Sequence, residues 1–317
     1  MTSLFDTLYA VLGYPFGYVL RFIYDYIAHN NYGLSLILFT LFARLLMIPT
    51  TISQQKSTVK TQRIQPKIRR INEKYKGDQQ KIQEETQALY RREGVNPMNM
   101  GCLPLAIQLP IIYGLIGVIY HPLKYALLIN SDAIAALTEQ AKALMGDAGS
   151  KVRFVELYII EHISELKGVA GVSDAVYQKI ENFNFTFCGI SLGSTPNMHE
   201  FNILWIIPIL AFASSMASSI YSMIRSKRQN PSTNFASMGC MMLFMPLFSL
   251  YLTFQFPAGI GLYWIASNVF AFITMIITGI IYSPSKLIAR DMVDETVKRR
   301  SKENYIKRLS EIKNKDA

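Results

Sequence analysis

Residues 31–51 have the sequence NYGLSLILFTLFARLLMIPTT, which is apolar and long enough to cross a bilayer, since a span takes about 20 residues. The inner half of this stretch carries one full charge, Arg44, which cannot escape by losing its proton. A charged side chain inside a span costs about 2.5 kcal/mol or more. Either the guanidinium extends along its own helix to an interface, or it faces a polar cavity within the membrane.

The composition of the whole chain is typical of a membrane protein. Of its 317 residues, 50% are hydrophobic and 17% are charged, whereas soluble domains carry about 25% charged residues. The net charge of +10 comes largely from Lys and Arg clustered beside the apolar blocks. In a soluble protein this charge would indicate nucleic acid, but the positive-inside rule explains most of it here, and we expect no DNA partner.

Cysteine spacing and sequence motifs exclude several classes of site. Cys102, Cys188 and Cys240 lie far apart and form no CxxC pair, so we expect neither a disulfide framework nor a metal site. His162 and His199 have no partners at ligand spacing. Neither GxxxxGK[ST], GxGxxG nor HExxH occurs. The sequence therefore predicts no cofactor, no nucleotide hydrolysis and no catalytic residues.

The apolar blocks predict an all-α polytopic membrane protein with five spans. These are residues 31–52, 100–121, 202–224, 238–256 and 259–282. Residues 1–30 have aromatic and aliphatic residues on one helical face and no basic n-region, which predicts an interfacial amphipathic helix, with a break at 13–15, rather than a cleavable signal peptide. The alternative for residues 1–30 is a short first span.

The polar segments between the spans set the topology. Residues 53–98 have two helical patterns around a turn at 76–78 and predict a basic helical hairpin, with a plain charged loop as the alternative. The hairpin, the 225–237 loop and the 283–317 tail hold eleven, three and ten Lys or Arg, against seven on the other side. The positive-inside rule then places these segments in the cytoplasm, with the N-terminus and the helical 122–201 region outside.

Three sets of residues within the spans have two interpretations each. Gln108 is either a hydrogen-bonding contact between helices or a cavity residue, and the serines of 214–222 are either a tight packing face or a polar wall. The third set is a methionine face, which suits either core filling or adaptable binding. Its members repeat at i, i+3, i+4 and i+7 and are Met238, Met241, Met242 and Met245.

Four motifs in this order resemble the YidC family of membrane protein insertases. They are TLFARLLMIPT (40–50), QPKIRRINEKYKGD (65–78), NPMNMGCLPLAIQLPIIYGL (96–115) and FQFPAGIGLYWIASN (254–268). The resemblance covers roughly residues 30–120 and 200–285, and the 123–200 region is long beside the compact members. It implies a five-helix core around a hydrophilic groove that is open to cytoplasm and lipid, in a multi-pass protein of the cell membrane.

The resemblance also implies roles for individual residues. The groove would hold the side chains of Arg44, Thr40, Gln108, Ser215, Tyr263, Trp264 and Ser267. A slide for passengers would be formed by Ile111, Leu115, Met238, Met241, Met242 and Met245. The implied partners are nascent membrane proteins and the lipid bilayer, with a Sec translocon, and the ribosome through the basic tail, as further candidates.

Other functions remain open at this point. An anion transporter or channel would also use an intramembrane arginine, but no internal repeat or pair of broken helices accompanies it. A structural scaffold is a third class. The tail itself has two interpretations, anchoring to anionic lipid or docking of translating ribosomes.

Overall fold

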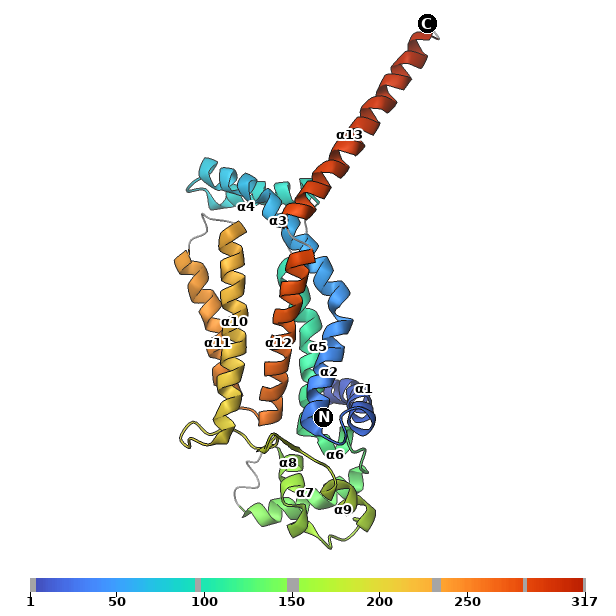
Figure 1. The fold of residues 1–317 in the computed structure, drawn as a ribbon, viewed down its shortest axis with the longest axis vertical. Coiled ribbons are helices and arrows are strands. Elements are labelled where there is room, and N and C mark those ends of the chain that lie inside the picture. Colours follow the sequence, from blue (N-terminus) through green and yellow to red (C-terminus); the bar gives the residue numbers. More distant parts are fainter. Residues whose placement is uncertain (1–3, 95–97, 147–153, 230–234, 282–283, 316–317) are drawn as a thin grey trace. The chain divides into compact units, whose positions relative to one another are not determined.

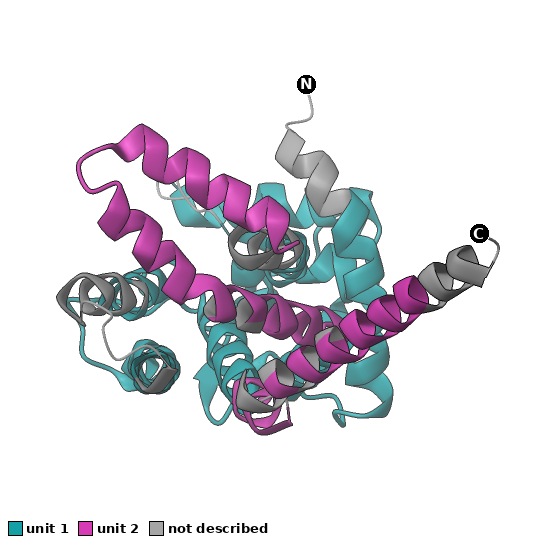
Figure 2. Ribbon diagram, turned by 90° about the horizontal axis from the view of Figure 1, so that it is seen from above, with its two compact units in different colours: residues 1–46, 105–273 teal, residues 47–104, 274–317 magenta. Residues whose placement is uncertain are grey.

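The structure is a computed structural model that describes residues 4–94, 98–146, 154–229, 235–281 and 284–315. It is mostly helical, as expected for the predicted fold class. The chain divides into two compact units, which Figure 2 shows in teal and magenta. Unit 1 comprises residues 1–46 and 105–273, and unit 2 comprises residues 47–104 and 274–317.

Unit 1 contains a group of long apolar helices. They are α1 (Leu4–Tyr26), α2 (Tyr32–Leu46), α5 (Met98–Tyr120), α10 (Ile206–Gln229), α11 (Phe235–Thr253) and α12 (Ala258–Ile281), of which α5 begins and α12 ends in unit 2. Within unit 1, the axes of α2, α5, α10, α11 and α12 are roughly parallel, with alternating chain direction, and α1 is roughly perpendicular to them (Figure 1). Because α2 and α12 lie in the same compact unit, polar side chains far apart in sequence can meet there.

The helices differ in how well they meet the requirements of a membrane span. Among the described residues, Ile203–Lys227 and Ala258–Ile281 are each long and apolar enough to cross a bilayer. Tyr32–Leu46 and Ile48–Ser57 make a third such segment if they are counted together as one bent span. The part of α5 from Leu109 to Tyr120 is apolar but shorter. These helices fit a membrane protein.

The helical segment that carries Arg44 is shorter than the predicted span of residues 31–52. Helix α2 ends at Leu46, and α3 (Ile48–Lys74) begins directly after Met47 with a proline in its first turn. That proline, Pro49, has no backbone N–H, and its ring would clash with the carbonyl of Leu45 in a continuous helix. The same residue is well tolerated at the start of α3, which explains the position of the break.

Helix α1 is continuous through Pro15, and the break that the sequence predicted at 13–15 is absent. Of the predicted apolar face, Phe16, Val19 and Ile23 pack inward, whereas Ile27 is exposed. Phe16 meets Phe39 of α2 edge to face at 5.4 Å. Gly17 permits the contact with α6 (Pro122–Tyr125), because a Cβ there would lie 2.2 Å from the Tyr125 carbonyl oxygen. A second, exposed face of α1 carries Tyr14, Tyr18, Phe22 and Tyr26.

Residues 122–201 form a small lobe of unit 1 with its own buried side chains. Its elements are α6, α7 (Ser131–Met145), α8 (Val155–Glu161), η2 (Ile163–Leu166), α9 (Asp174–Glu181), β1 (Thr186–Phe187) and β2 (Ile190–Ser191), followed by η3 (Ile203–Trp205). Leu123, Leu137, Ile159 and Ile180 are all fully buried, so the lobe packs like a soluble protein.

The sequence predicted a helical 122–201 region, but residues 186–191 within it form a short β-hairpin. Thr186 pairs with Ser191, and Phe187 pairs with Ile190. The two residues between the strands, Cys188 and Gly189, both have positive φ. Two positive φ angles are what a tight type I′ turn requires, and Gly supplies one of them without strain. The pattern was missed because each strand has only two residues.

Unit 2 contains α3, α4 (Gln79–Arg92) and α13 (Pro284–Lys315), and α3 packs against both of the others. Asp78 begins α4 by accepting a hydrogen bond from the Lys81 backbone N–H at 3.0 Å. Lys67 of α3 pairs with Glu93, directly after α4. The apolar interior of these described residues is small, since α4 buries none of its side chains and Ile64 is the fully buried one of α3.

Candidate functional site

Arg44 contacts a polar side chain on another helix of unit 1. Its Nη2 donates a hydrogen bond to the Oγ of Ser267, which lies on α12, 223 positions further along the chain. Ser267 is only 4% exposed, and Arg44 is half-buried. The guanidinium therefore points toward another helix instead of following its own helix to an interface.

The other predicted residues of α2 and α12 surround this contact in different ways. Tyr263 lies one turn before Ser267, is buried, and is close enough to Arg44 for its phenol to interact with the charge. Thr40 is also buried, but its hydroxyl donates to the Leu36 carbonyl of its own helix at 2.6 Å. Trp264 packs edge to face against Phe256 at 5.8 Å. Thus Ser267 bonds to Arg44 and Tyr263 lies near its charge, while Thr40 bonds to its own helix and Trp264 packs against Phe256.

A second polar contact joins α12 to α10 and lies next to the first in sequence. Asn268 Nδ2 donates to the Oγ of Ser214 at 3.3 Å, and the Ser214 hydroxyl donates to the Ala211 carbonyl at 3.0 Å. The predicted groove residue Ser215 follows Ser214 on α10 and is half-buried. Adjacent polar residues in an apolar helix, Ser267 and Asn268, were the signal for this pair.

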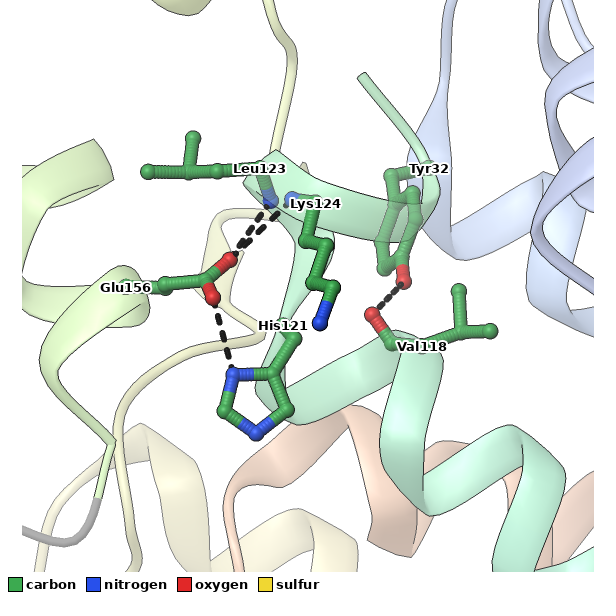
Figure 3. A network of polar contacts seen from close by, with 6 residues as sticks. All are labelled: Tyr32, Val118, His121, Leu123, Lys124 and Glu156. Atoms are coloured by element: carbon green, nitrogen blue, oxygen red, sulfur yellow. Dashed lines mark hydrogen bonds and ion pairs between the residues drawn. The ribbon is translucent and has the colours of Figure 1, made fainter. Parts of the chain in front are cut away.

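A further polar network connects the end of α5 to the lobe (Figure 3). Glu156 of α8 is 7% exposed, and its Oε2 accepts hydrogen bonds from the backbone N–H groups of Leu123 at 2.9 Å and Lys124 at 3.3 Å. Its Oε1 lies 2.8 Å from His121 Nδ1. The hydroxyl of Tyr32 donates to the Val118 carbonyl at 3.5 Å. A buried carboxylate with three partners is well satisfied, so Glu156 fixes α8 to α6 and to His121, which directly follows α5.

Comparison with known proteins places the chain in a family. The family model described as "60Kd inner membrane protein" matches residues 22–284, which include α2, the lobe and α12. The chain belongs to the 60Kd inner membrane protein family, the YidC family. The matched residues include Arg44 and its two neighbours on α12, Tyr263 and Ser267.

Several relatives of the family are similar over most of the chain. Membrane protein insertase MisCA of Bacillus subtilis is 29% identical over 245 residues, covering 76% of this chain and 67% of the relative. Membrane protein insertase YidC 2 of Listeria innocua is 28% identical over 299 residues, covering 91% and 79%. Membrane protein insertase YidC 2 of Bacillus anthracis is 26% identical over 250 residues, covering 78% of this chain and 71% of the relative.

The predicted slide residues of this YidC-family chain are described only in part. Leu115 is 1% exposed and belongs to the main apolar core, and Ile111 is half-buried. The side chains of four slide methionines and of one groove residue lie outside the described residues; they are Met238, Met241, Met242, Met245 and Gln108. Further along α11, Leu243, Phe244, Leu247 and Phe248 are exposed.

Residues 189–193 (GISLG) match the GxSxG pattern of serine hydrolases. Ser191 lies on β2 in a two-residue strand and donates a hydrogen bond to Glu161 Oε1, which also accepts from Ser194 at 3.1 Å. The motif requires a strand–turn–helix and a histidine partner for the serine. The described residues supply neither at Ser191, and they contain no group of three potential metal ligands.

Proposed function

We propose that this chain is a membrane protein insertase that moves segments of nascent membrane proteins from the cytoplasm into the bilayer, without nucleotide hydrolysis and without acting as an enzyme. The observation that carries the proposal is the Arg44–Ser267 contact, a charged side chain held between two apolar helices of a YidC-family member. The names of its relatives, membrane protein insertases, support the same function.

The mechanism we propose rests on a hydrophilic groove among α2, α5, α10, α11 and α12. A passenger's polar end must cross a hydrocarbon layer about 30 Å thick, and a wet groove part of the way through shortens that barrier. Arg44 would attract acidic residues of the passenger, with Tyr263, Ser267 and Asn268 as polar neighbours. The free energy would come from partition of the passenger's apolar segment into lipid and from the membrane potential, about 2.3 kcal/mol per charge per 100 mV.

We assign the topology from the charge distribution. The helical hairpin of α3 and α4, the 225–237 loop and the tail would lie in the cytoplasm, and the N-terminus and the lobe would lie outside. The five-helix core would then sit in the cell membrane. Passengers would leave along α5 and α11, at Ile111 and the methionine face, with Leu115 supporting α5 from inside. A Sec translocon and the ribosome are the further partners we propose.

The test is insertion of a small membrane protein into proteoliposomes that contain the purified chain. Arg44→Ala should reduce insertion strongly because the positive charge is lost, and Arg44→Lys should retain most of it because the charge remains. Lys142→Ala, which removes an exposed charge of the lobe, is the matched control and should insert at the normal rate.

Two results would contradict the proposal. Equal loss in Arg44→Ala and Arg44→Lys would mean that the guanidinium has a structural role with fixed geometry. Anion flux through empty proteoliposomes, with no insertion of the passenger, would assign the arginine to a transporter or channel instead.

A further inference from the structure

A cavity of about 310 Å³ lies in unit 1 at α1, the α6–α7 connection and α9, outside the Arg44 site. Its charged lining residues are Arg21 and Asp25 of α1 and Lys179 of α9, and Asn30, Asn182 and Tyr24 add polar groups. The volume is within the range of small-molecule sites, which begins at about 300 Å³. Neither the family assignment nor the proposed insertion mechanism uses this cavity.

The charges around the cavity leave a positive excess. Arg21 Nε pairs with Asp25 Oδ2 at 3.3 Å, and among the described residues the two terminal nitrogens of the guanidinium have no hydrogen-bond partner. Lys179 donates to the Leu127 carbonyl, and its ammonium has three protons, so two remain for a ligand. Two cations therefore face one carboxylate.

The environment of Lys179 is consistent with an unfilled anion site. Burial lowers the pKa of Lys179, the nearby charge of Arg21 lowers this pKa further, and Asp25 opposes the shift. Like charges held close together disfavour the charged form of the lysine. An anion bound between Arg21 and Lys179 would remove this repulsion.

The backbone at the rim of the cavity is held in an uncommon conformation. His29, Asn30 and Leu128 have φ angles of 49°, 58° and 51°, a region that side chains other than Gly rarely adopt. Asn30 lines the cavity, and Leu128 follows the lining residue Leu127, whose carbonyl accepts from Lys179. Such strain persists where the surrounding structure enforces it, and it clusters at binding sites.

The neighbouring surface of α1 indicates where the ligand comes from. The exposed residues Tyr14, Tyr18, Phe22 and Tyr26 repeat every four positions and form an aromatic stripe along the helix. Tyrosine is enriched where a membrane meets water, at the level of the lipid headgroups. Arg21 and Asp25 line the cavity and directly precede Phe22 and Tyr26, so the cavity lining and the aromatic stripe share this part of α1.

We propose that the cavity binds the headgroup of a phosphatidylethanolamine molecule, with its phosphate between Arg21 and Lys179 and its ammonium at Asp25. The acyl chains would lie along the aromatic stripe of α1. The lipid would tie α1 to α9, and hence to the lobe. This site is independent of the insertase proposal, because it uses none of the residues around Arg44.

The test is a lipid titration of the full chain in detergent, followed by native mass spectrometry that counts bound phosphatidylethanolamine. The double variant Arg21→Gln with Lys179→Gln keeps polar side chains but removes both charges. Its affinity should fall about tenfold or more for each cation, because hydrogen bonds to charged groups are the strong ones. The pair Arg21→Lys with Lys179→Arg should retain most of the binding.

Controls separate the lipid from other sources of phosphate. Lys142→Gln, in the same lobe but away from the cavity, should bind like the unmodified chain. Soluble glycerophosphoethanolamine should bind at least tenfold more weakly, since it lacks acyl chains. Asp25→Asn should abolish the preference for phosphatidylethanolamine over phosphatidylglycerol, which has no amine.

Three results would overturn the proposal. Undiminished binding in the double Gln variant would show that the two cations do not hold the lipid. Equal binding of glycerophosphoethanolamine would make this a site for a soluble phosphate compound. Equal losses in the double Gln variant and the double charge-retaining variant, with unchanged thermal unfolding of both, would show that charge is not what the site recognises.

Discussion

The lobe buries large apolar side chains in its interior, whereas helices α10 to α12 expose many of theirs on the surface. In the lobe, Leu137 and Ile159 are fully buried, and the polar groups of Glu156 have partners within the fold. On α10 and α11, large apolar residues such as Leu210, Phe244 and Leu247 point outward. The lobe therefore behaves like a protein in water, whereas the helices have the surface of a protein in lipid.

This difference shows which interactions hold each region together. In water, burial of apolar side chains is the main driving force of folding. In lipid that force is absent between helices, so packing and a few polar contacts decide which helices associate. Arg44–Ser267 and Asn268–Ser214 are contacts of this second kind. Substitutions of the same type should thus have different effects in the two regions.

The largest expected difference comes from one substitution made in both regions. Leu137→Ala in α7 should lower the free energy of unfolding by about 2–5 kcal/mol, because it leaves a cavity in a closed core. Leu247→Ala in α11, where the side chain is 50% exposed, should change it by about 0.5 kcal/mol or less. Denaturant unfolding of both variants in detergent measures the difference, and equal losses would refute the distinction.

Removing the buried charge that joins α8 to α6 and to His121 should have the next largest effect. Glu156→Gln keeps the shape of the side chain but weakens its bonds to His121, Leu123 and Lys124, and it should cost about 1.5–3 kcal/mol. Thermal unfolding in detergent measures this loss. Glu139→Gln, an exposed position of α7, is the control and should leave the midpoint unchanged. A normal midpoint for Glu156→Gln would mean that the network contributes little.

The polar contact between α10 and α12 should be weaker than the network of the lobe. Asn268→Ala should cost about 0.6 kcal/mol, the average for hydrogen bonds between helices in a membrane. Unfolding in mixed micelles measures this cost, with Ser219→Ala of α10 as the control. A loss as large as that of Glu156→Gln would show that the contact is not in a lipid-like environment.

The tail should have the smallest effect on stability, since the described side chains of α13 from Thr296 to Lys307 are all exposed. Deletion of residues 297–317 should leave the unfolding midpoint unchanged. It should weaken co-sedimentation with ribosomes, more at low salt than at high salt, because basic residues there would contact RNA phosphates. Unchanged co-sedimentation at low salt would leave the tail with anchoring to anionic lipid alone.

Much of the local structure could be predicted because it depends on neighbours in the sequence. The turn before α4 follows from Gly77 and the Asp78 cap, and the apolar runs of α10 and α12 predict long membrane helices. Pro49 lies within the apolar residues 31–51, but the helix break beside it was not predicted because prolines are tolerated within membrane helices. Here α2 ends at Leu46, and a new helix begins at Ile48 with Pro49 in its first turn.

The sequence by itself determined the class of protein, the position of a charge within an apolar run and the resemblance to a family, because composition, apolar runs and motifs are local properties. Only the tertiary structure decided that Arg44 meets Ser267, that Ser214 bonds to Asn268 of α12, and that Arg21 and Lys179 line one cavity. Each of these pairs is brought together by the packing of elements that are distant in the chain. Periodicity identifies the face of a helix, but it does not identify the helix on the other side.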